Sequence, residues 1–484
     1  MPLRLALLGL ALGCCSCGSD RRAPKPSLKG DTDTDTPTSG GSTVTGDGVT
    51  ASCIQQVDNA LRFDCQITLD TPGTVAIRFT DGGETRTRAS TDGSALEHTV
   101  TLWGMKPATS HNWTVIVDGV DGPSSTVTTD ALPAELDRIE IEVSGTDPVT
   151  DHVIFSTSCG NEGYALIAGS DGEIYWYQAT SDAEVAIVFT DDQTVIVPGT
   201  DRVLEYDMGG NLVFEVNTGV DFDGPLHHDA TKYDGHIYAL FADAYPVGNE
   251  LVVIDGLYVF DSSGGLVETW ELNDYLSLTE ADLDGVRDQF WAQEFPGSLD
   301  FTHANSVFVD DSGIYVSTRW VSTVWKIKGL GEPDFGDIVW SLTGEAASPI
   351  APDLTLTSAV PGDADFIGQH HATLSASGDL TLFDNRKVGN NSRGLVISVD
   401  EGPRTAQIIA AYPMPQSCSV QGGIFGLANG DVLVTCPSIA TTFHFREGTS
   451  TEGFTMKATC NSGPGGPGGG RPQTVRMQPI DLQG

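Results

Sequence analysis

The chain has 484 residues, of which 39% are hydrophobic and 19% are charged, and its formal net charge at pH 7 is -41. This length suffices for two or three domains, or for one large repeat domain with an appendage. The acidic balance excludes nucleic acid and anionic membrane surfaces as default partners, because like charges repel and no basic cluster interrupts the acidic sequence. A solvated acidic surface of this kind is typical of extracellular or salty environments.

The first twenty residues, MPLRLALLGLALGCCSCGSD, carry one arginine, then an apolar run, then small residues and cysteines. This layout is typical of a secretory signal and is too short to span a bilayer. Residues 10–13 before Cys14 resemble a bacterial lipobox, although Cys15 and Cys17 are neighbouring alternatives. The resemblance implies a signal peptide over residues 1–13, lipid attachment at Cys14, and an exported lipoprotein of the periplasm or cell surface, anchored in the outer membrane.

Six cysteines follow the signal region, and an even count in an exported chain predicts disulfides, with 15 possible pairings. Proximity on adjacent predicted strands favours the first pair, and proximity in sequence favours the second. The third pair would then link the start and end of the large domain. The expected pairs are Cys53 with Cys65, Cys418 with Cys436, and Cys159 with Cys460. No CxxC spacing indicates a zinc site.

Two regions precede the large domain. Residues 14–50 are rich in Ser, Thr, Asp, Gly and Pro and have almost no core-forming side chain, which predicts a flexible acidic tether. Residues 51–131 contain short alternating strands at a spacing that favours a small β-sandwich. Within them, TLWGMKPATSHNWTVIV resembles the Leu-Gly-Pro-aromatic turn of fibronectin type III domains. We expect a fibronectin type III-like sandwich that acts as a spacer or brace.

Residues 132–462 repeat one plan of short strands joined by Gly- or Asp-containing turns. Six such segments begin near residues 152, 186, 228, 303, 370 and 422. Periods of this length with three or four strands each indicate the blades of an all-β, six-bladed β-propeller around a central channel. Residues 463–484 form a Gly/Pro-rich tail, and its last apolar alternation is a candidate for completing a blade.

Histidines recur at the start of three consecutive segments, in HDAT, HANS and HHAT. Aligned on these motifs, His228, His303 and His370 occupy the same place, just before the innermost strand of each blade. Equivalent positions in a closed ring point at one axis, so we expect these three imidazoles to converge. Arg319, at the end of the strand that pairs with the His303 strand, is expected to join them.

Such a cluster predicts an anion-binding site. A neutral imidazole can act as a nucleophile or carry a proton near pH 7, and the planar fork of an arginine suits the oxygens of a sulfate or phosphate. A single histidine before a strand is more often a cap or turn residue, and three histidines can also ligate a metal. Arg319 would place a cation beside such a metal, and only Asp229 offers an adjacent carboxylate, so no metal is expected.

The sequence around these residues resembles the bacterial arylsulfotransferases, the PAPS-independent aryl-sulfate sulfotransferases of the periplasm. The similarity rests on an ordered set of motifs within residues 150–445: HHDA, DFTHANSV, STRWVSTVWKI, GDIVWSLTG and DFIGQHHATL, then LFDN with Ser392 and Arg393 behind it. It implies a six-bladed propeller preceded by a small β-domain. It also implies a ping-pong reaction without a cofactor, in which a histidine takes the sulfuryl group from a phenolic sulfate ester and passes it to a phenol.

Carried over to this chain, the resemblance assigns the role of sulfated nucleophile to His370. His228 and His303 then assist at the sulfuryl or phenol oxygens, and Asn305 and Arg319 hold the sulfate. The remaining members of the expected substrate-binding set are His227, His371 and Arg393. His371 departs from the family pattern, in which an Asp commonly follows the nucleophile.

Two other functions stay open on the sequence. One is a catalytically silent, lipid-anchored propeller that serves binding or adhesion, which would not require the histidines and Arg319 in one channel. The other is a sulfate-ester hydrolase that gives the sulfuryl group to water, which turnover without phenol would reveal.

Overall fold

In the computed structural model, the described residues are 41–80, 83–146, 148, 150–158, 163–180, 186–283, 290–362, 364–386, 389–460 and 476–482. The expected signal peptide, the lipidation site Cys14, most of the expected tether and Cys159 lie outside them. The chain divides into two compact units, residues 1–38 and 39–484, and all described residues belong to the second.

Within the described residues the structure is almost entirely β, and its helices are three short 3-10 turns, η1 (Leu272–Tyr275), η2 (Glu280–Leu283) and η3 (Pro437–Ile439). In this part of the chain, no helix is long and apolar enough to cross a membrane.

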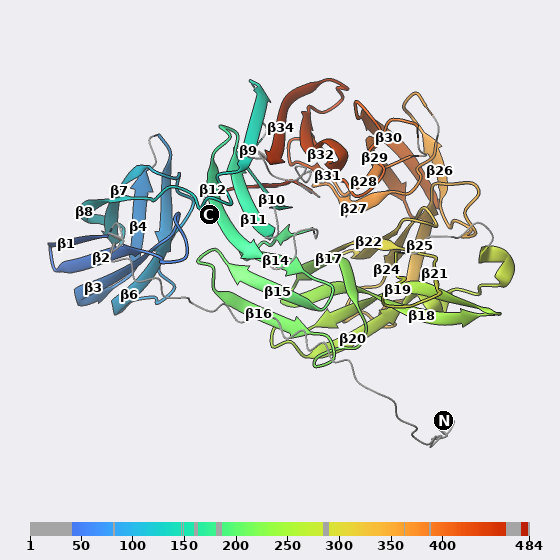
Figure 1. Cartoon of the computed structure of the whole chain (residues 1–484), viewed down its shortest axis with the longest axis horizontal. Helices are drawn as coiled ribbons and strands as arrows, with labels where there is room; N and C mark the ends of the chain where they lie inside the picture. Colours follow the sequence, from blue (N-terminus) through green and yellow to red (C-terminus); the bar gives the residue numbers. More distant parts are fainter. Residues whose placement is uncertain are drawn as a thin grey trace, which may run out of the picture. The chain divides into compact units, whose positions relative to one another are not determined.

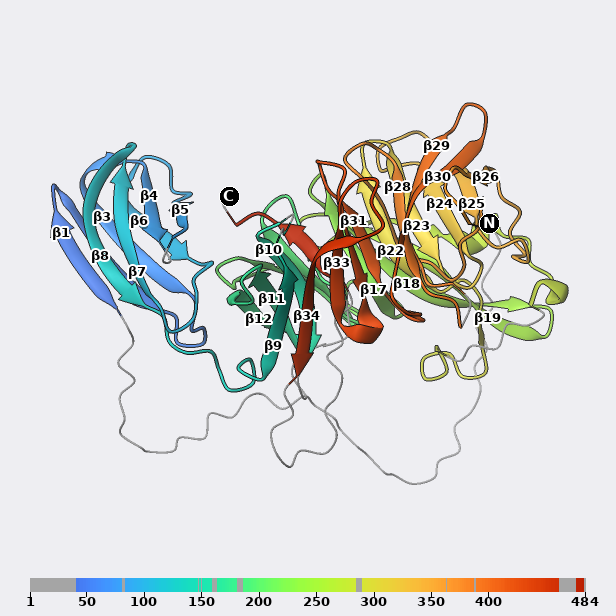
Figure 2. The ribbon, with the colours of Figure 1, turned by 90° about the horizontal axis from the view of Figure 1, so that it is seen from above.

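Residues 42–128 form two four-stranded sheets (Figure 2). The first, in spatial order, comprises β1 (Ser42–Gly46), β2 (Val49–Gln55), β3 (Phe63–Gly73) and β6 (Ala95–Leu102). The second comprises β5 (Thr85–Ala89), β4 (Val75–Thr80), β7 (Ser110–Val117) and β8 (Val120–Thr128). Alternate side chains of β2, β4 and β7 are buried in one shared core, which includes Trp113. This is the inside-outside alternation expected where a sheet has one buried face.

The remaining strands form six further sheets, one for each repeated sequence segment (Figure 1). Sheets I to III are, in spatial order: sheet I, β35 (Gln478–Ile480), β10 (His152–Ser158), β11 (Gly163–Gly169) and β12 (Ile174–Thr180); sheet II, β13 (Val188–Phe189), β14 (Thr194–Pro198), β15 (Arg202–Asp207) and β16 (Leu212–Asn217); and sheet III, β17 (Leu226–Tyr233), β18 (His236–Val247), β19 (Glu250–Phe260) and β20 (Leu266–Glu271), with β21 (Leu299–Asp300) beside β19.

Sheets IV to VI continue the series. They are, in spatial order: sheet IV, β22 (Ala304–Asp310), β23 (Gly313–Thr318), β24 (Thr323–Ile327) and β25 (Ile338–Thr343); sheet V, β27 (His370–Leu374), β28 (Leu380–Asp384), β29 (Arg393–Asp400), β30 (Thr405–Pro413) and β26 (Thr355–Ser358); and sheet VI, β31 (Gly423–Gly426), β32 (Val432–Cys436), β33 (Thr441–Phe445), β34 (Glu452–Cys460) and β9 (Ile139–Gly145). The arrangement is propeller-like (Figure 1).

Both ends of this region are tied into the sheets. β9 adds an outer strand to sheet VI, and β35, the last apolar alternation of the tail, pairs with β10 in sheet I, as expected of a segment that completes a blade. The C-terminal segment therefore returns to the first sheet after the chain has formed the last one. The first and last sheets are linked in this way at both ends of the series.

A repeated hydrogen bond latches each of three innermost strands to the next. In each case a side chain accepts the backbone N–H of the neighbouring strand, with distances of 3.1, 2.9 and 3.1 Å. The pairs are Asp229 with Val307, Ser306 with Ala372, and His371 with Ile424. These latches fix the strand ends that carry the histidines.

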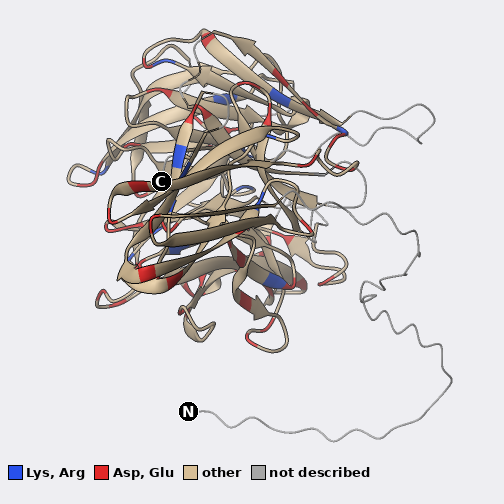
Figure 3. Ribbon diagram, turned by 90° about the vertical axis from the view of Figure 1, so that its left-hand side faces the viewer, with Lys and Arg blue, Asp and Glu red and all other residues tan. Residues whose placement is uncertain are grey.

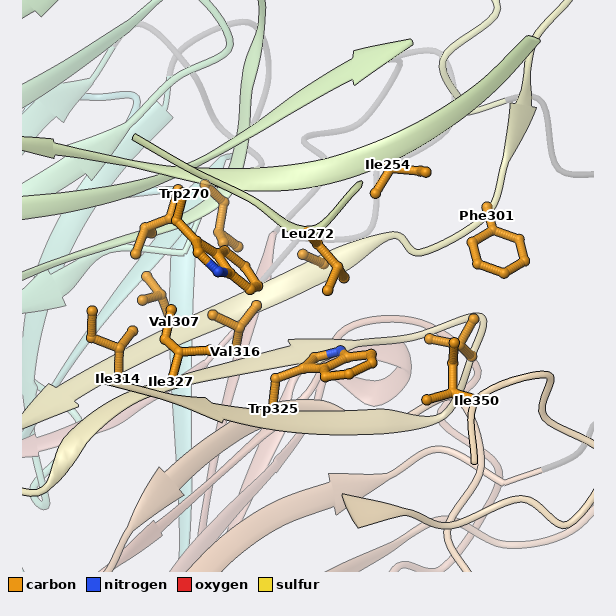
Figure 4. Close-up of a cluster of buried hydrophobic side chains, with 14 of the residues drawn as sticks. Ile254, Trp270, Leu272, Phe301, Val307, Ile314, Val316, Trp325, Ile327 and Ile350 are labelled. Atoms are coloured by element: carbon orange, nitrogen blue, oxygen red, sulfur yellow. The ribbon is translucent and has the colours of Figure 1, made fainter. Parts of the chain in front are cut away.

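Apolar clusters lie between the sheets, and one of them joins sheets III and IV (Figure 4). Trp270, from the outer strand of sheet III, and Trp325, in sheet IV, are 3% and 4% exposed. Trp325 also donates its indole N–H to Thr318, at the end of β23. Packing of this kind holds the strand ends of adjacent sheets rigidly.

Polar and aromatic contacts fasten the N-terminal sheets to sheet I. Arg62 donates to the carbonyl oxygen of Tyr177 at 2.6 Å and lies 4.9 Å above the ring of Trp176. Arg88 donates to the carbonyl oxygen of Leu482 at 3.0 Å, in the last described segment. Burial lowers the pKa of Arg88 to about 9. Asp and Glu residues are spread over many loops and strands of the ribbon (Figure 3).

Candidate active site

The predicted histidines gather where the innermost strands of sheets III, IV and V begin. His228 lies in β17, His303 directly precedes β22, and His370 opens β27. The rings of His228 and His303 are 4.8 Å apart at 72°. His370 is close enough for electrostatic coupling to both of them. The structure thus brings together three imidazoles that are far apart in sequence.

One detail of the sequence alignment is wrong by two residues. The side chain that accepts the latch hydrogen bond marks equivalent positions, which are Asp229, Ser306 and His371 in sheets III, IV and V. The residues directly before them are then equivalent too, so Asn305 occupies the place of His228 and His370. His303 instead reaches the cluster from two positions earlier, where the pairing of β22 with β23 shifts register between Ala304 and Ser306. A bulge of this kind re-aims side chains at a strand end.

The tautomer of His370 follows from its partner, Asn385. Oδ1 of Asn385 lies 2.7 Å from Nδ1 of His370, while the Asn385 amide nitrogen donates to the carbonyl oxygens of Cys418 and Gln421 at 2.6 and 2.9 Å. Since both nitrogen hydrogens are used on carbonyls, the Asn385 oxygen is the acceptor and Nδ1 of His370 carries the proton. Nε2 of His370 therefore keeps its lone pair.

His228 is held by a relay that begins at a buried carboxylate. Nε2 of His227 lies 3.0 Å from Asp255, and Nδ1 of His227 lies 2.9 Å from Nδ1 of His228. Burial raises the pKa of Asp255, but hydrogen bonds from His227, Thr302 and the Ala304 N–H outweigh it, so the pKa lies below its ordinary value. Facing the ionised Asp255, Nε2 of His227 carries the ring proton, which leaves Nδ1 of His227 to accept from Nδ1 of His228.

His303 has a carboxylate partner of its own. Asp300 accepts a hydrogen bond from Nδ1 of His303 and another, at 3.1 Å, from the indole N–H of Trp320. Burial holds the pKa of Asp300 above its ordinary value, against those two hydrogen bonds. Among the three converging imidazoles, His303 is therefore the one whose Nδ1 faces a carboxylate directly.

The electrostatic environment favours neutral rings at His228 and His370. Burial, followed by the charge of Arg319, holds the pKa of His370 well below its usual range, against the hydrogen bond with Asn385. Burial and the neighbouring His303 do the same for His228, although its side chain keeps some exposure. A neutral imidazole with a free Nε2 is a competent nucleophile near pH 7.

Arg319 stands beside this cluster. Its backbone N–H donates to the carbonyl oxygen of His303 at 3.0 Å, and its guanidinium lies 4.2 Å above the ring of Trp320. Nη2 donates to the carbonyl oxygen of Ser419 at 2.8 Å. Trp320 is 37% exposed, so the guanidinium is placed on a partly open aromatic surface next to the histidines.

Asn305 and His371 serve the strand framework in this structure. The side chain of Asn305 donates to the Gln369 carbonyl at 2.8 Å and accepts the His371 N–H at 3.3 Å. Nδ1 of His371 accepts the Ile424 N–H, and its ring lies 4.5 Å from that of Phe425. The imidazole of His371 thus makes the latch that the carboxylate of Asp229 makes in sheet III.

Arg393 is also engaged in the framework. Its Nε donates to Asp384 at 2.8 Å and its Nη2 to Asp365 at 2.9 Å. Arg393 is buried, so this ion-paired set braces the start of β29 rather than offering a free guanidinium.

Two expected disulfides are confirmed, Cys53 with Cys65 and Cys418 with Cys436. Cys460 is also disulfide-bonded, and its expected partner, Cys159, lies outside the described residues. The Cys418–Cys436 bridge is relevant to the site because Cys418 supplies one of the carbonyl oxygens that hold Asn385.

Sequence reasoning missed Asn385, Asp255, Asp300 and Arg476. Asn385 ends the LFDN motif and Asp300 lies three residues before His303, so both stood in motifs already singled out. Asp255 and Arg476 carried no comparable signal. Among the described residues, no group of three or more His, Cys, Asp or Glu side chains is arranged to hold a metal ion.

Comparisons with solved structures give low overall similarity. A virginiamycin B lyase from Staphylococcus aureus is 11% identical, with 66% of this chain and 100% of that chain covered and a TM-score of 0.36. A periplasmic gluconolactonase from Pseudomonas aeruginosa is 12% identical, with 68% and 99% covered and a TM-score of 0.37. No curated protein matches the chain.

The family comparison covers most of the region that holds the site. The model of the arylsulfotransferase (ASST) family matches residues 140–452, which include sheets II to V and the whole histidine cluster. The chain belongs to the arylsulfotransferase family.

Proposed function

We propose that this protein is an aryl-sulfate sulfotransferase that moves a sulfuryl group from a phenolic sulfate ester to a phenol through a sulfated His370. Family membership supports sulfotransfer between small aryl substrates. The observation that carries the choice of nucleophile is the hydrogen bond between His370 and Asn385, which leaves Nε2 of a neutral, buried imidazole with its lone pair.

The partners of the imidazoles separate their roles. His370 is backed by a neutral amide, which stabilises a second proton on the ring less than a carboxylate would. His303 is backed by Asp300, so this pair can hold a proton and release it. A neutral nucleophile beside a carboxylate-backed acid is the division of labour that group transfer from an ester requires.

In the first half-reaction, Nε2 of His370 attacks the sulfur of the ester in line with the aryl oxygen. The N–S bond forms as the bond between sulfur and aryl oxygen breaks, and the leaving phenolate takes the proton held by His303 and Asp300. Arg319 supplies a cation at the sulfuryl oxygens, where it stabilises negative charge, and His228 lies beside the same position with a lone pair on its Nε2. Nδ1 of His370 keeps its proton, so the sulfated ring is an N-sulfo-imidazolium whose charge the amide of Asn385 accommodates.

The second half-reaction reverses these steps with a new phenol. The pair of His303 and Asp300 takes the phenol proton, the phenol oxygen attacks sulfur, and the N–S bond breaks to return the neutral His370. Donor and acceptor use the same sulfuryl position in turn, so the kinetics are ping-pong. The chemistry needs no nucleotide because the donor is already an activated ester.

The test uses the full chain with 4-nitrophenyl sulfate as the donor and phenol as the acceptor. Release of nitrophenol with formation of phenyl sulfate is expected for the wild-type protein and is lost in His370→Ala. His236→Ala is the matched control, because the His236 ring bonds to the Asp234 carbonyl at the turn that joins β17 and β18, and among the described residues no contact links it to the three converging histidines. Equal turnover in the two variants would refute the assignment, and nitrophenol release without phenyl sulfate would indicate a hydrolase.

The same proposal extends to the architecture. Sheets I to VI are interpreted as the blades of a six-bladed β-propeller, closed by β9 at one end and β35 at the other. The sheets over residues 42–128 are interpreted as a fibronectin type III-like sandwich, and their contacts with sheet I support a brace rather than a loose spacer. An experimental structure of the full chain tests both points.

Export as a lipoprotein is a further part of the proposal. The two bridges between described cysteines support an oxidising compartment, where disulfides persist. A lipid at Cys14 would hold the enzyme at the outer membrane. Metabolic labelling with a fatty acid should label the expressed protein and fail to label Cys14→Ala, whereas equal labelling of both would contradict Cys14 as the acceptor.

A further inference from the structure

Arg476, from the tail of the chain, contacts the innermost strands of two neighbouring sheets. It is only 6% exposed. Nη1 pairs with the Asp229 carboxylate at 3.0 Å, and Nη2 donates to the Asn305 carbonyl oxygen at 2.7 Å. One guanidinium therefore contacts the inner strands of sheets III and IV at once.

The residues that Arg476 contacts are joined to all three imidazoles. Asp229 follows His228 directly and latches onto β22 through the Val307 N–H. Asn305, two residues after His303, bonds through its side chain to Gln369 and His371, which flank His370. Arg476 thus lies at the junction of the hydrogen bonds that set the relative positions of the histidine-bearing strands.

The tail is held independently at positions next to Arg476. The Met477 N–H donates to Thr435 at 3.1 Å, and the Gln478 side chain bonds to both the N–H and the carbonyl of Phe189 at 2.9 Å. Space is also reserved for the arginine, because a Cβ at Gly423 would lie 3.0 Å from the Cγ of Arg476. The segment therefore delivers this side chain to a prepared position.

We propose that Arg476 is a positioning residue for sulfuryl transfer, which bridges Asp229 and Asn305 and so sets the relative positions of His228, His303 and His370. This inference rests on the proposed function. It assigns a role in the reaction to the C-terminal segment, which lies outside residues 140–452 matched by the family. The planar guanidinium of Arg476 binds Asp229 and Asn305 at once, which the single ammonium group of a lysine cannot do.

The test compares Arg476→Gln and Arg476→Lys with a second buried arginine that also holds the tail. Arg88 provides that control, because it donates to the Leu482 carbonyl oxygen but lies among the N-terminal strands. We expect kcat/KM for 4-nitrophenyl sulfate with phenol to fall by roughly 10²-fold in both Arg476 variants, since small displacements of reacting groups have effects of this size. Arg88→Gln should lower the melting temperature and leave kcat/KM unchanged.

The pH dependence of kcat/KM distinguishes the loss of the Arg476 charge from a displacement of the histidines. Arg319, His303 and Arg476 each lower the pKa of the His370 ring, and His228 and His371 are further titratable groups coupled to it. Arg476→Gln removes one of these charges, so the acidic limb of the kcat/KM profile should move to higher pH. Arg476→Lys should keep the limb in place while kcat/KM stays low.

Several results would overturn the inference. A folded Arg476→Gln variant with the kcat/KM of the wild type would overturn it. An equal decrease of kcat/KM in Arg88→Gln would overturn it as well. If the wild-type protein transfers no sulfuryl group at all, the proposed function fails, and histidine titration by NMR then decides the inference. Unchanged chemical shifts and titration curves for the His228, His303 and His370 rings in Arg476→Gln would refute the positioning role on its own.

Discussion

Asn385 accepts a hydrogen bond from Nδ1 of His370 at 2.7 Å, while its own nitrogen is committed to two backbone carbonyls. An amide held in this way accepts the proton of a neutral imidazole and stabilises a second proton on the ring only weakly, because the amide carries no charge. A carboxylate in its place would stabilise the imidazolium. The choice of amide therefore keeps Nε2 of His370 nucleophilic.

Replacing this amide tests that relationship. Asn385→Asp should raise the pKa of His370, because a negative charge then faces Nδ1, and the acidic limb of kcat/KM should shift upward by about one pH unit or more. Turnover at neutral pH should fall as well, since the new carboxylate opposes the Cys418 and Gln421 carbonyls. The measurement is the pH dependence of sulfuryl transfer.

The control for this variant is Asn391→Asp. Asn391 is exposed and donates to the Met414 carbonyl in the adjacent loop. The carboxylate of Asn391→Asp adds the same charge nearby without contacting His370. An equal shift of the limb in both variants would mean that general electrostatics, rather than the Asn385 contact, sets the pKa of His370.

The disulfide between Cys418 and Cys436 should support activity through Asn385. Its removal in the Cys418→Ser, Cys436→Ser double variant opens a loop of sequence separation 18, which corresponds to a loss of about 3 kcal/mol in the free energy of unfolding. Because Cys418 also holds the Asn385 amide, kcat should fall together with stability. Urea unfolding and initial rates measure the two effects.

The second confirmed disulfide is the matched comparison. Cys53 and Cys65 bridge β2 and β3 far along the chain from the histidines. Their double Ser variant should lose stability and keep kcat. A kcat that survives removal of the Cys418–Cys436 bridge would exclude a role for that bridge in the site.

Stability should depend on pH through the buried histidines. The folded-state pKa of His370 is depressed, so the unfolded chain binds more protons as the pH falls below about 6.5, and the free energy of unfolding decreases. His370→Asn removes this contribution, so its stability should fall less steeply between pH 7 and 5. The slope should differ from wild type by at most about 1.4 kcal/mol per pH unit.

Denaturant unfolding at several pH values measures these slopes, with His236→Asn as the comparison. Taking differences between variants at the same pH removes the contributions of other groups. Parallel wild-type and His370→Asn curves would contradict a depressed pKa at His370.

The leaving group distinguishes an acid from a binding residue. If His303 protonates the departing phenolate, His303→Asn should slow transfer more from phenyl sulfate than from 4-nitrophenyl sulfate, because phenol, like tyrosine with a pKa of about 10, is the weaker acid. Arg319→Gln should slow both donors to a similar extent, since it acts at the sulfuryl oxygens. Equal losses for the two donors in His303→Asn would remove His303 from the acid role.

The grouping of the histidines follows from sequence because repeated segments of a closed ring place equivalent strand ends together. The exact equivalence does not follow, because each of the three strands has a register shift beside its histidine, and together these shifts leave Asn305, rather than His303, equivalent to His228 and His370. Periodicity cannot reveal such shifts.

The supporting residues were harder to infer. Asn385 stands in the LFDN motif, but its role depends on carbonyl oxygens of a loop more than thirty residues later. Arg476 follows a Gly/Pro-rich stretch; the apolar alternation after it suggests a strand, but nothing in the sequence indicates that Arg476 contacts Asp229 and Asn305. Long-range hydrogen bonds, rather than local pattern, give both residues their place.

The most direct test of the central claim is the mass of the enzyme after mixing with 4-nitrophenyl sulfate alone. The account predicts a burst of nitrophenol equal to the enzyme concentration and the gain of one sulfuryl group on the peptide that contains His370, which is then lost to added phenol as phenyl sulfate. A sulfuryl group on any other residue, or transfer to phenol with no modified enzyme, would contradict it.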